Sequence, residues 1–233
     1  MSRRDVSGPA GWAALGAGTA FAILAAAVHA DAPRWPDDRF LSWSVAHRPH
    51  LAVTVARGVT ATGTGAVPYV LAVLAGLLAG RSPKQRVLTT VLCLACLAVG
   101  QTLRFEVMQL VHRSRPPTTD WAAHATRWAF PSGHTTTSAL AAGVLIAAAS
   151  LWAPRGATPL RIVIGCWALL VGLTRIYLGV HWFTDVLGGW LFAVGWLGAC
   201  LWALARWLPD SFRQSDTVGQ RPAEDHAPQN PHR

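Results

Sequence analysis

The chain has 233 residues, of which 52% are apolar and only 13% are charged, and its formal net charge is +9. Soluble domains carry about twice that charged fraction. The composition therefore excludes a largely disordered chain, a coiled coil and a disulfide-rich secreted module, and it predicts a membrane protein. In such a protein the positive charge indicates cytoplasmic loops and anionic ligands, and we expect no nucleic-acid partner.

Six stretches without Asp, Glu, Lys or Arg are candidates for membrane-spanning helices. They cover residues 6–30, 58–80, 87–103, 135–154, 162–174 and 186–205. A helix needs about 20 residues to cross a hydrocarbon core of ~30 Å. The third run reaches that length if its helix continues to Val111, and the fifth if it continues through Arg175 to about Val180. An arginine inside a membrane helix is costly and indicates function.

These runs predict an all-α integral membrane protein in which six transmembrane helices form a bundle over residues 1–207. The polar segment 208–233 is expected to be a disordered cytoplasmic tail. Residues 6–30 also fit a cleaved signal peptide, which would leave five spans and change no other orientation. The oligomeric state is left open.

Basic residues predict the orientation of the bundle. Clusters near Arg3, at 81–86, at 155–161 and from Arg206 onward are each separated from the next by two predicted spans. All four therefore lie on one face, which the positive-inside rule makes cytoplasmic. The opposite, extracytoplasmic face receives the ends of the third to sixth helices.

Three polar clusters fall at those extracytoplasmic helix ends. They are Arg-Ser-Arg-Pro-Pro at 113–117, Pro-Ser-Gly-His at 131–134 and a segment from Arg175 to Asp185 that contains His181. The orientation was assigned from other residues, so this agreement predicts one shared site.

The second cluster and the arginines are suited to an anion. Ser132, Gly133 and His134 begin a predicted helix, whose free N–H groups and dipole favour a negative group, and Gly133 permits close backbone approach. Arg115 and Arg175 are planar donors for bidentate phosphate binding. Phosphate is therefore the expected ligand.

The histidines supply the chemistry. His181 and Asp185 are spaced i, i+4, so on a helix the carboxylate accepts from Nδ1–H and leaves Nε2 free as a nucleophile. His134 provides the proton that the leaving oxygen needs. Together the groups predict phosphoryl transfer through a phosphohistidine, with no metal and no cofactor.

At these residues the sequence resembles the type 2 phosphatidic acid phosphatase superfamily. Its signature runs Lys-x6-Arg-Pro, then Pro-Ser-Gly-His, then Ser-Arg-x5-His-x3-Asp, and the motifs cover roughly residues 100–190 here. The resemblance implies His181 as nucleophile, Asp185 as its orienting carboxylate and His134 as general acid. It also implies phosphoryl binding by four residues, namely Arg115, Arg175, Ser132 and Gly133. Thr174 stands in place of the serine of the third motif.

One position departs from the signature. The lysine expected seven residues before Arg115 is Met108. Arg104 lies one turn further back on the same helix face and is a candidate replacement, as are Arg113 and Arg127. The alternative is a site with one phosphate contact fewer.

The resemblance implies a bacterial membrane lipid phosphatase of the cytoplasmic membrane, with its site facing outside and a lipid phosphate as substrate. We expect a polyprenyl diphosphate such as undecaprenyl diphosphate, and phosphatidic acid or phosphatidylglycerol phosphate as alternatives. A lipid phosphotransferase and a non-enzymatic lipid-phosphate binder or transporter remain as other hypotheses. Six apolar spans argue against a vanadium haloperoxidase, a soluble class within the same superfamily.

Overall fold

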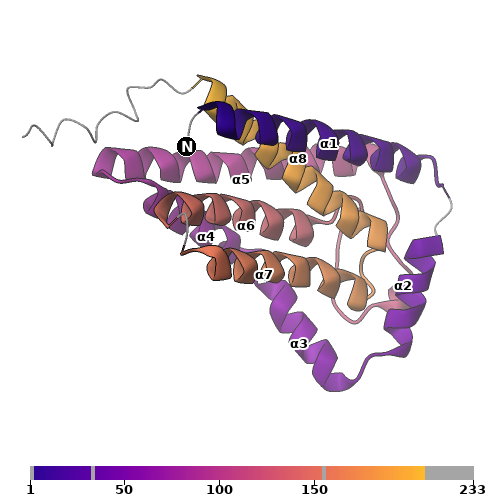
Figure 1. Ribbon diagram of the computed structural model, residues 1–233. Helices are drawn as coiled ribbons and strands as arrows, with labels where there is room; N and C mark the ends of the chain where they lie inside the picture. The colour runs from indigo at the N-terminus through magenta and orange to yellow at the C-terminus, as the bar shows by residue number, and fades with distance from the viewer. Residues whose placement is uncertain (1–2, 33–34, 154–155, 208–233) are drawn as a thin grey trace, which may run out of the picture.

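In the computed structural model, residues 3–32, 35–153 and 156–207 are described, and every regular element in these ranges is a helix (Figure 1). The predicted cytoplasmic tail lies outside the described residues. The helices are α1 (Arg3–His29), α2 (Trp35–Ala46), α3 (His50–Ala61), α4 (Ala66–Ala79), α5 (Pro83–Val111), the short 3-10 helix η1 (Thr118–Asp120), α6 (Gly133–Trp152), α7 (Thr158–Tyr177) and α8 (Phe183–Trp207).

Five of these helices are long and apolar enough to cross a membrane, namely α1, α5, α6, α7 and α8. The helices α3 and α4 meet at a bend of 50° and together make a sixth candidate span. The prediction of an all-helical membrane bundle is confirmed.

The second predicted span differs from the continuous helix expected over residues 58–80. The helix stops at Ala61 and resumes at Ala66, and α4 alone has 14 residues, about 21 Å, which is too short for a ~30 Å core. Gly65 adopts a positive φ of 65°, which is outside the range of a right-handed helix, so the helix cannot continue through it. Gly63 packs so closely on Val171 of α7 that an added Cβ would lie 2.3 Å from it.

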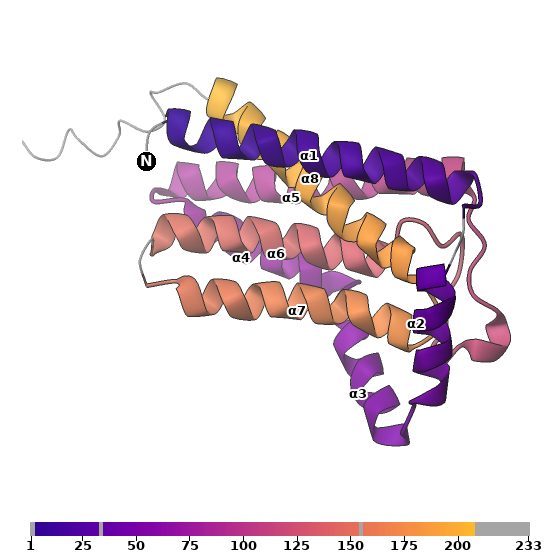
Figure 2. The same ribbon diagram turned by 45° about the vertical axis from the view of Figure 1, so that its right-hand side comes forward.

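Helix α6 is the centre of the bundle. It packs against α4, α5, α7 and α8, while α1 runs along α8 on the outside (Figures 1 and 2). Glycines allow the close approach that membrane helices use. A Cβ on Gly143 of α6 would lie 2.2 Å from Leu197 of α8, and one on Gly198 of α8 would lie 2.8 Å from the nitrogen of Ala14 in α1.

Helix α5 carries the first motif to the site. It begins with a capping box, in which the Ser82 side chain accepts from the Gln85 N–H and the Gln85 side chain accepts from the Ser82 N–H. Its 29 residues extend about 43 Å, and it ends at His112 in the left-handed conformation. The third predicted span thus continues to Val111 as expected.

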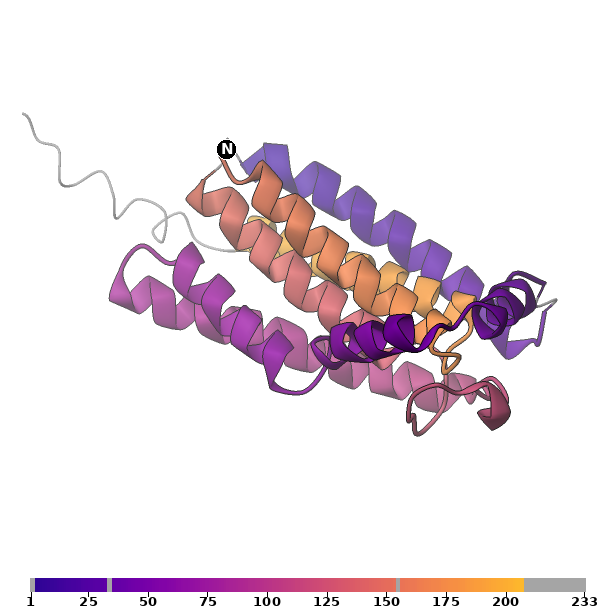
Figure 3. The ribbon, with the colours of Figure 1, turned by 90° about the horizontal axis from the view of Figure 1, so that it is seen from below.

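The two ends of the bundle differ in composition. One end holds α2, η1 and the starts of α6 and α8 (Figures 1 and 3). The opposite end holds the basic residues Lys84, Arg86, Arg161 and Arg206. The polar motifs and the basic loops therefore lie at opposite ends of the molecule.

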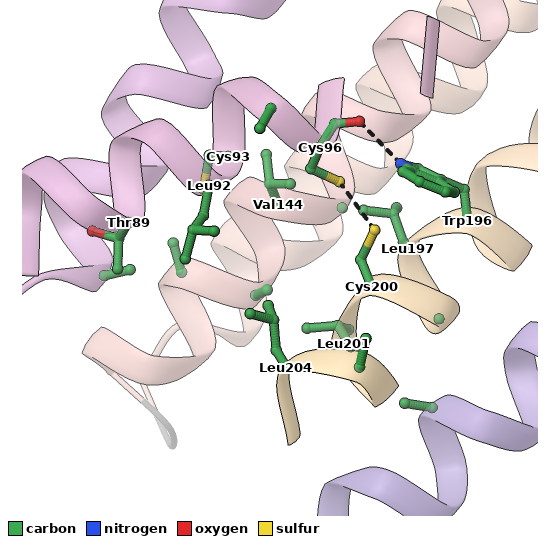
Figure 4. A pocket seen from close by; sticks show the side chains of 18 of the residues that line it. Thr89, Leu92, Cys93, Cys96, Val144, Trp196, Leu197, Cys200, Leu201 and Leu204 are labelled. Carbon is green, nitrogen blue, oxygen red and sulfur yellow. Dashed lines mark hydrogen bonds between the residues drawn. The ribbon is translucent and has the colours of Figure 1, made fainter. Parts of the chain in front are cut away.

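An apolar cavity of about 750 Å³ lies in the half of the bundle away from the motifs. Residues of α1, α4, α5, α6 and α8 line it (Figure 4), and none of the lining residues is charged. The sulfurs of Cys96 and Cys200 are 3.8 Å apart at its wall. Gly143 at this cavity lies ten residues along α6 from Gly133, about 15 Å away. The lining suits hydrocarbon and cannot bind a phosphate.

Candidate active site

The structure brings the three polar clusters together at one end of the bundle. The first cluster follows α5, the second begins α6, and the third connects α7 to α8. His134 of the second cluster interacts electrostatically with Arg175 and His181 of the third and with Arg115 of the first. The sequence prediction of a single shared site is consistent with this arrangement.

His181 and Asp185 form the buried pair that their spacing predicted. Nδ1 of His181 lies 3.2 Å from Oδ2 of Asp185, and both side chains are almost fully buried. The helical explanation for the contact is wrong, because His181 lies in the turn before α8, which begins at Phe183. Asp185 stands in the first turn of α8 and its Oδ2 also accepts from the backbone N–H of Trp182 at 2.9 Å, so helix capping aims the carboxylate at His181.

The other ring nitrogen of His181 faces an arginine. Nη1 of Arg115 lies 2.9 Å from Nε2 of His181, and backbone carbonyls of Thr126 and Arg127 hold the rest of the Arg115 guanidinium. Burial, with the positive charges of Arg115 and Arg175, lowers the pKa of His181 well below its ordinary value. The imidazole is therefore neutral at neutral pH, with Nε2 carrying the lone pair.

The second motif forms the N-terminus of α6 as predicted. Ser132 is the N-cap residue and is fully buried, and Gly133 is the first helical residue. His134 lines a cavity together with Arg175, which lies in the last turn of α7. In the described part of the chain, Nη1 of Arg175 donates to Thr60 at 3.1 Å, whereas its buried Nε has no hydrogen-bond partner.

Arg104, the first candidate to replace the missing lysine, lies next to the second motif. Its guanidinium carbon would be 3.6 Å from a Cβ on Gly133, so this cation stands beside the N-terminus of α6. Nη1 of Arg104 contacts the sulfur of the buried Met108 at 3.4 Å, and Nε donates to Gln101 at 3.1 Å. The side chain thus crosses over Met108, the position of the missing lysine.

The two other candidate cations are placed differently. Arg127 lies over the ring of Phe105 at 5.3 Å. Arg113 is engaged with carboxylates on both sides, because Nη1 bonds Asp185 and Nη2 bonds Asp37, each at 2.6 Å. Of the three arginines, Arg104 is the one beside the predicted phosphate site.

Asp37 is a residue that the motif analysis missed. It lies in α2, far from the motifs in sequence, and only 1% of its surface is exposed. Besides Arg113, Asp37 accepts from the backbone N–H of Thr184 at 2.8 Å and from the Thr184 hydroxyl. A buried chain of ion pairs and hydrogen bonds thus runs from Asp37 through Arg113 and Asp185 to His181. The sequence offers only the adjacent pair Asp37-Asp38, which also fits ordinary charges at a helix N-terminus.

Among the described residues, no three His, Cys, Asp or Glu side chains gather as ligands for a metal ion. The arginines and the helix N-terminus are the positive groups available to a phosphoryl group here. The expectation of chemistry without metal or cofactor remains a prediction.

Comparison with known proteins places the chain in a family. The family model of the PAP2 superfamily matches residues 109–209. Phosphatidylglycerophosphatase B of Bacillus subtilis is 32% identical over 182 residues, which cover 76% of this chain and 86% of that protein. Lipid A 1-phosphatase of Rhizobium etli is 37% identical over a shorter stretch of 78 residues, 34% of this chain and 30% of that protein.

A solved structure has the same fold over most of its length. The transmembrane PAP2-type phosphatidylglycerolphosphate phosphatase from Bacillus subtilis superposes with a TM-score of 0.69 at 27% identity, covering 84% of this chain and 94% of the other. The motifs in the sequence, the helical membrane bundle and the extent of these matches all indicate the same family. The chain therefore belongs to the PAP2 superfamily and is a multi-pass membrane phosphatase of that family.

Proposed function

We propose that the protein hydrolyses a lipid phosphate through a phosphohistidine on His181. The observation that carries the proposal is the environment of that imidazole. Asp185 faces Nδ1 at 3.2 Å, and Nε2 is directed toward Arg115 at 2.9 Å. A carboxylate that orients one nitrogen, with a phosphate-binding group at the other, is the arrangement of a nucleophilic histidine.

The reaction has two steps. In the first, Nε2 of His181 attacks phosphorus in line, the bond from phosphorus to the leaving oxygen breaks, and His134 donates a proton to that oxygen. In the second, His134 accepts a proton from water, which attacks phosphorus and breaks the bond to Nε2. The products are inorganic phosphate and the dephosphorylated lipid, and His181 is again neutral.

Three arginines stabilise the charge on the transferring group. Arg115 contacts Nε2 of His181, so an incoming phosphoryl oxygen takes over its Nη1 donor and frees the nitrogen lone pair. Arg175 offers its buried Nε, which has no partner among the residues that the structure describes, and Arg104 lies beside Gly133 at the N-terminus of α6. Preorganised donors in a site of low dielectric act on the charge that develops in phosphoryl transfer.

Phosphatidylglycerol phosphate is the first substrate to test, because the relative that aligns along most of its length is named for that reaction. A polyprenyl diphosphate such as undecaprenyl diphosphate is the second candidate. The observation in its favour is the position of the site opposite the basic end of the bundle, which the positive-inside rule orients outward.

The intermediate gives the most specific test. Protein in detergent is mixed with 32P-labelled dioctanoyl phosphatidic acid and quenched in alkali, which preserves a phosphohistidine. We expect label on the wild type and on the matched control His50→Ala, whose exposed imidazole lies at the start of α3, and none on His181→Ala. Label that persists on His181→Ala would contradict the proposal.

The same site could pass the phosphoryl group to a lipid rather than to water. Turnover in 18O-labelled water distinguishes the two outcomes. A hydrolase places one solvent oxygen in each phosphate released, whereas a phosphotransferase yields a new lipid phosphate without solvent oxygen.

A further inference from the structure

The cavity beside the predicted catalytic groups is larger than one phosphoryl group requires. Its volume is about 600 Å³, within the range of about 300–1,000 Å³ that is usual for small-molecule sites. His134 and Arg175 contribute to its lining, and among the lining residues without a part in the proposed reaction are Arg57, Trp121 and His124. The cavity therefore has room and polar groups for a further part of the substrate.

The guanidinium of Arg57 in α3 is held through its Nε, while its two Nη groups remain for a ligand. Its Nε donates to the backbone carbonyl of Ala122 at 2.7 Å. In the described part of the chain it has no carboxylate partner, and its side chain is exposed. Because the guanidinium is rigid and planar, anchoring Nε leaves the two Nη groups directed together, as bidentate phosphate binding requires.

The segment that carries His124 is also held in place. The N–H of Ala122 donates to the carbonyl of Leu178 at 2.8 Å, and the indole N–H of Trp121 donates to the carbonyl of Pro116 at 2.9 Å. The exposed imidazole of His124 lies two residues after Ala122 and lines the same cavity as Arg57. The backbone next to His124 is therefore held close to Arg57, whose Nε bonds Ala122.

The charges around the cavity do not balance. Its lining residues include two arginines and two histidines and no Asp or Glu. The unpaired, buried Nε of Arg175 is a further donor without an acceptor among the described residues. One phosphoryl group bound between His134 and Arg175 leaves the guanidinium of Arg57 without a counter-charge.

We propose that Arg57, assisted by His124, binds a second phosphoryl group of the substrate. The chain would then prefer lipids in which the reacting phosphate is followed by another one, either a diphosphate or a phosphate ester on a phosphodiester headgroup, over lipids with a single phosphate. This inference rests on the proposed function and narrows its substrate class. It assigns Arg57 to specificity and not to the chemical step.

The test compares matched substrates that differ by one phosphoryl group. Farnesyl diphosphate is paired with farnesyl phosphate, and dioctanoyl phosphatidylglycerol phosphate with dioctanoyl phosphatidic acid, so the two pairs also distinguish the two headgroup chemistries. We expect Arg57→Gln to raise KM about tenfold for at least one two-phosphate lipid, with kcat almost unchanged. Its effect on the single-phosphate partner should stay within about twofold.

Two variants control for a purely structural effect. Arg57→Lys keeps the charge and should recover part of the preference, although an ammonium lacks the bidentate geometry. Arg39→Gln removes an exposed arginine of α2 at the same end of the bundle, outside the cavity lining, and should leave the preference unchanged. An equal loss on all four substrates would show that Arg57 only anchors the Ala122 segment, and an unchanged preference in Arg57→Gln would also overturn the proposal.

Binding separates this proposal from the phosphatase proposal. In a His181→Ala background, which removes the proposed nucleophile, the affinities for methylenediphosphonate and methylphosphonate are measured by calorimetry. We expect tighter binding of the diphosphonate by about tenfold or more, and loss of that advantage when Arg57→Gln is added. Equal affinities for the two compounds would refute the second subsite, whether or not the wild type turns over a lipid.

Discussion

At the scale of single residues, the buried chain from Asp37 to His181 connects α2 to the proposed chemistry. Arg113 is held between two carboxylates, so its position relative to Asp185 depends on Asp37. Removing one charge from such a network leaves the remaining charges unbalanced in a buried site. Without this charge the Asp185 carboxylate is less firmly held, and its hydrogen bond with Nδ1 of His181 is weakened.

We therefore predict that Asp37→Asn lowers kcat by roughly ten- to a hundredfold with little change in KM, because small displacements of a reacting group are costly. Asp38→Asn is the matched control, since its carboxylate is adjacent and exposed. Steady-state kinetics and thermal unfolding in detergent would be measured for both variants. If kcat in Asp37→Asn equals that of Asp38→Asn, Asp37 has no positioning role.

Arg104 gives a second prediction at this scale. Arg104→Gln should lower kcat/KM about tenfold or more, since it removes a cation beside Gly133, and Met108→Lys should have little effect alone because Arg104 already occupies that region. In the double variant the new lysine should restore much of the loss. Arg127→Gln is the control, and a failure of Met108→Lys to rescue would argue against the replacement.

The sequence singled out the histidines and arginines of the motifs as candidate site residues, but it did not predict the side-chain contacts that hold them in place. Helix spacing favoured Arg104 as the replacement cation, but it left Arg113 and Arg127 as other candidates, because the choice depends on which side chain is already paired. Arg113 is bound by two carboxylates and Arg127 lies on Phe105, and neither contact has a local sequence signal. Asp37 was missed for the same reason, since its partners are more than 70 residues away.

At the scale of elements, the break between α3 and α4 has a testable cause. Gly63 packs on Val171 of α7, with 2.3 Å between its ideal Cβ and the nearest valine atom. We predict that Gly63→Ala destabilises the bundle by about 1–3 kcal/mol, the usual cost of overpacking. Gly58→Ala is the control, because a Cβ there meets nothing within 4 Å. Equal melting temperatures for the two variants in detergent would contradict this explanation.

The membrane helices were largely predictable, whereas their ends and breaks were not. Apolar length located α1, α5, α6, α7 and α8, because backbone groups in lipid must form helices. The bend at 62–65 coincides with the packing of Gly63 on Val171 of α7, a contact between segments far apart in the sequence. The short helix α2 was not among the predicted elements. The turn that places His181 before α8 also escaped prediction, although the i, i+4 spacing still brought it to Asp185.

In the whole molecule, the proposed catalytic groups and the basic residues that predict the membrane orientation are separated along the bundle axis. The proposed catalytic groups lie at one end, while Lys84, Arg86, Arg161 and Arg206 lie at the other. A phosphatase with its site at a membrane boundary can bind a charged headgroup while the lipid tail stays among apolar helices. The deeper apolar cavity is about 15 Å from Gly133 and has no charged lining, so it adds nothing to the phosphate site.

The proposed function requires phosphatase activity that depends on His181 and needs no added metal. Its most direct test is phosphate release by the detergent-purified protein in EDTA, with His181→Ala alongside. The substrates are phosphatidylglycerol phosphate, undecaprenyl diphosphate and phosphatidic acid. We predict release from at least one lipid by the wild type and background release by His181→Ala. Release that survives His181→Ala, or that EDTA abolishes and Mg²⁺ restores, would contradict the account.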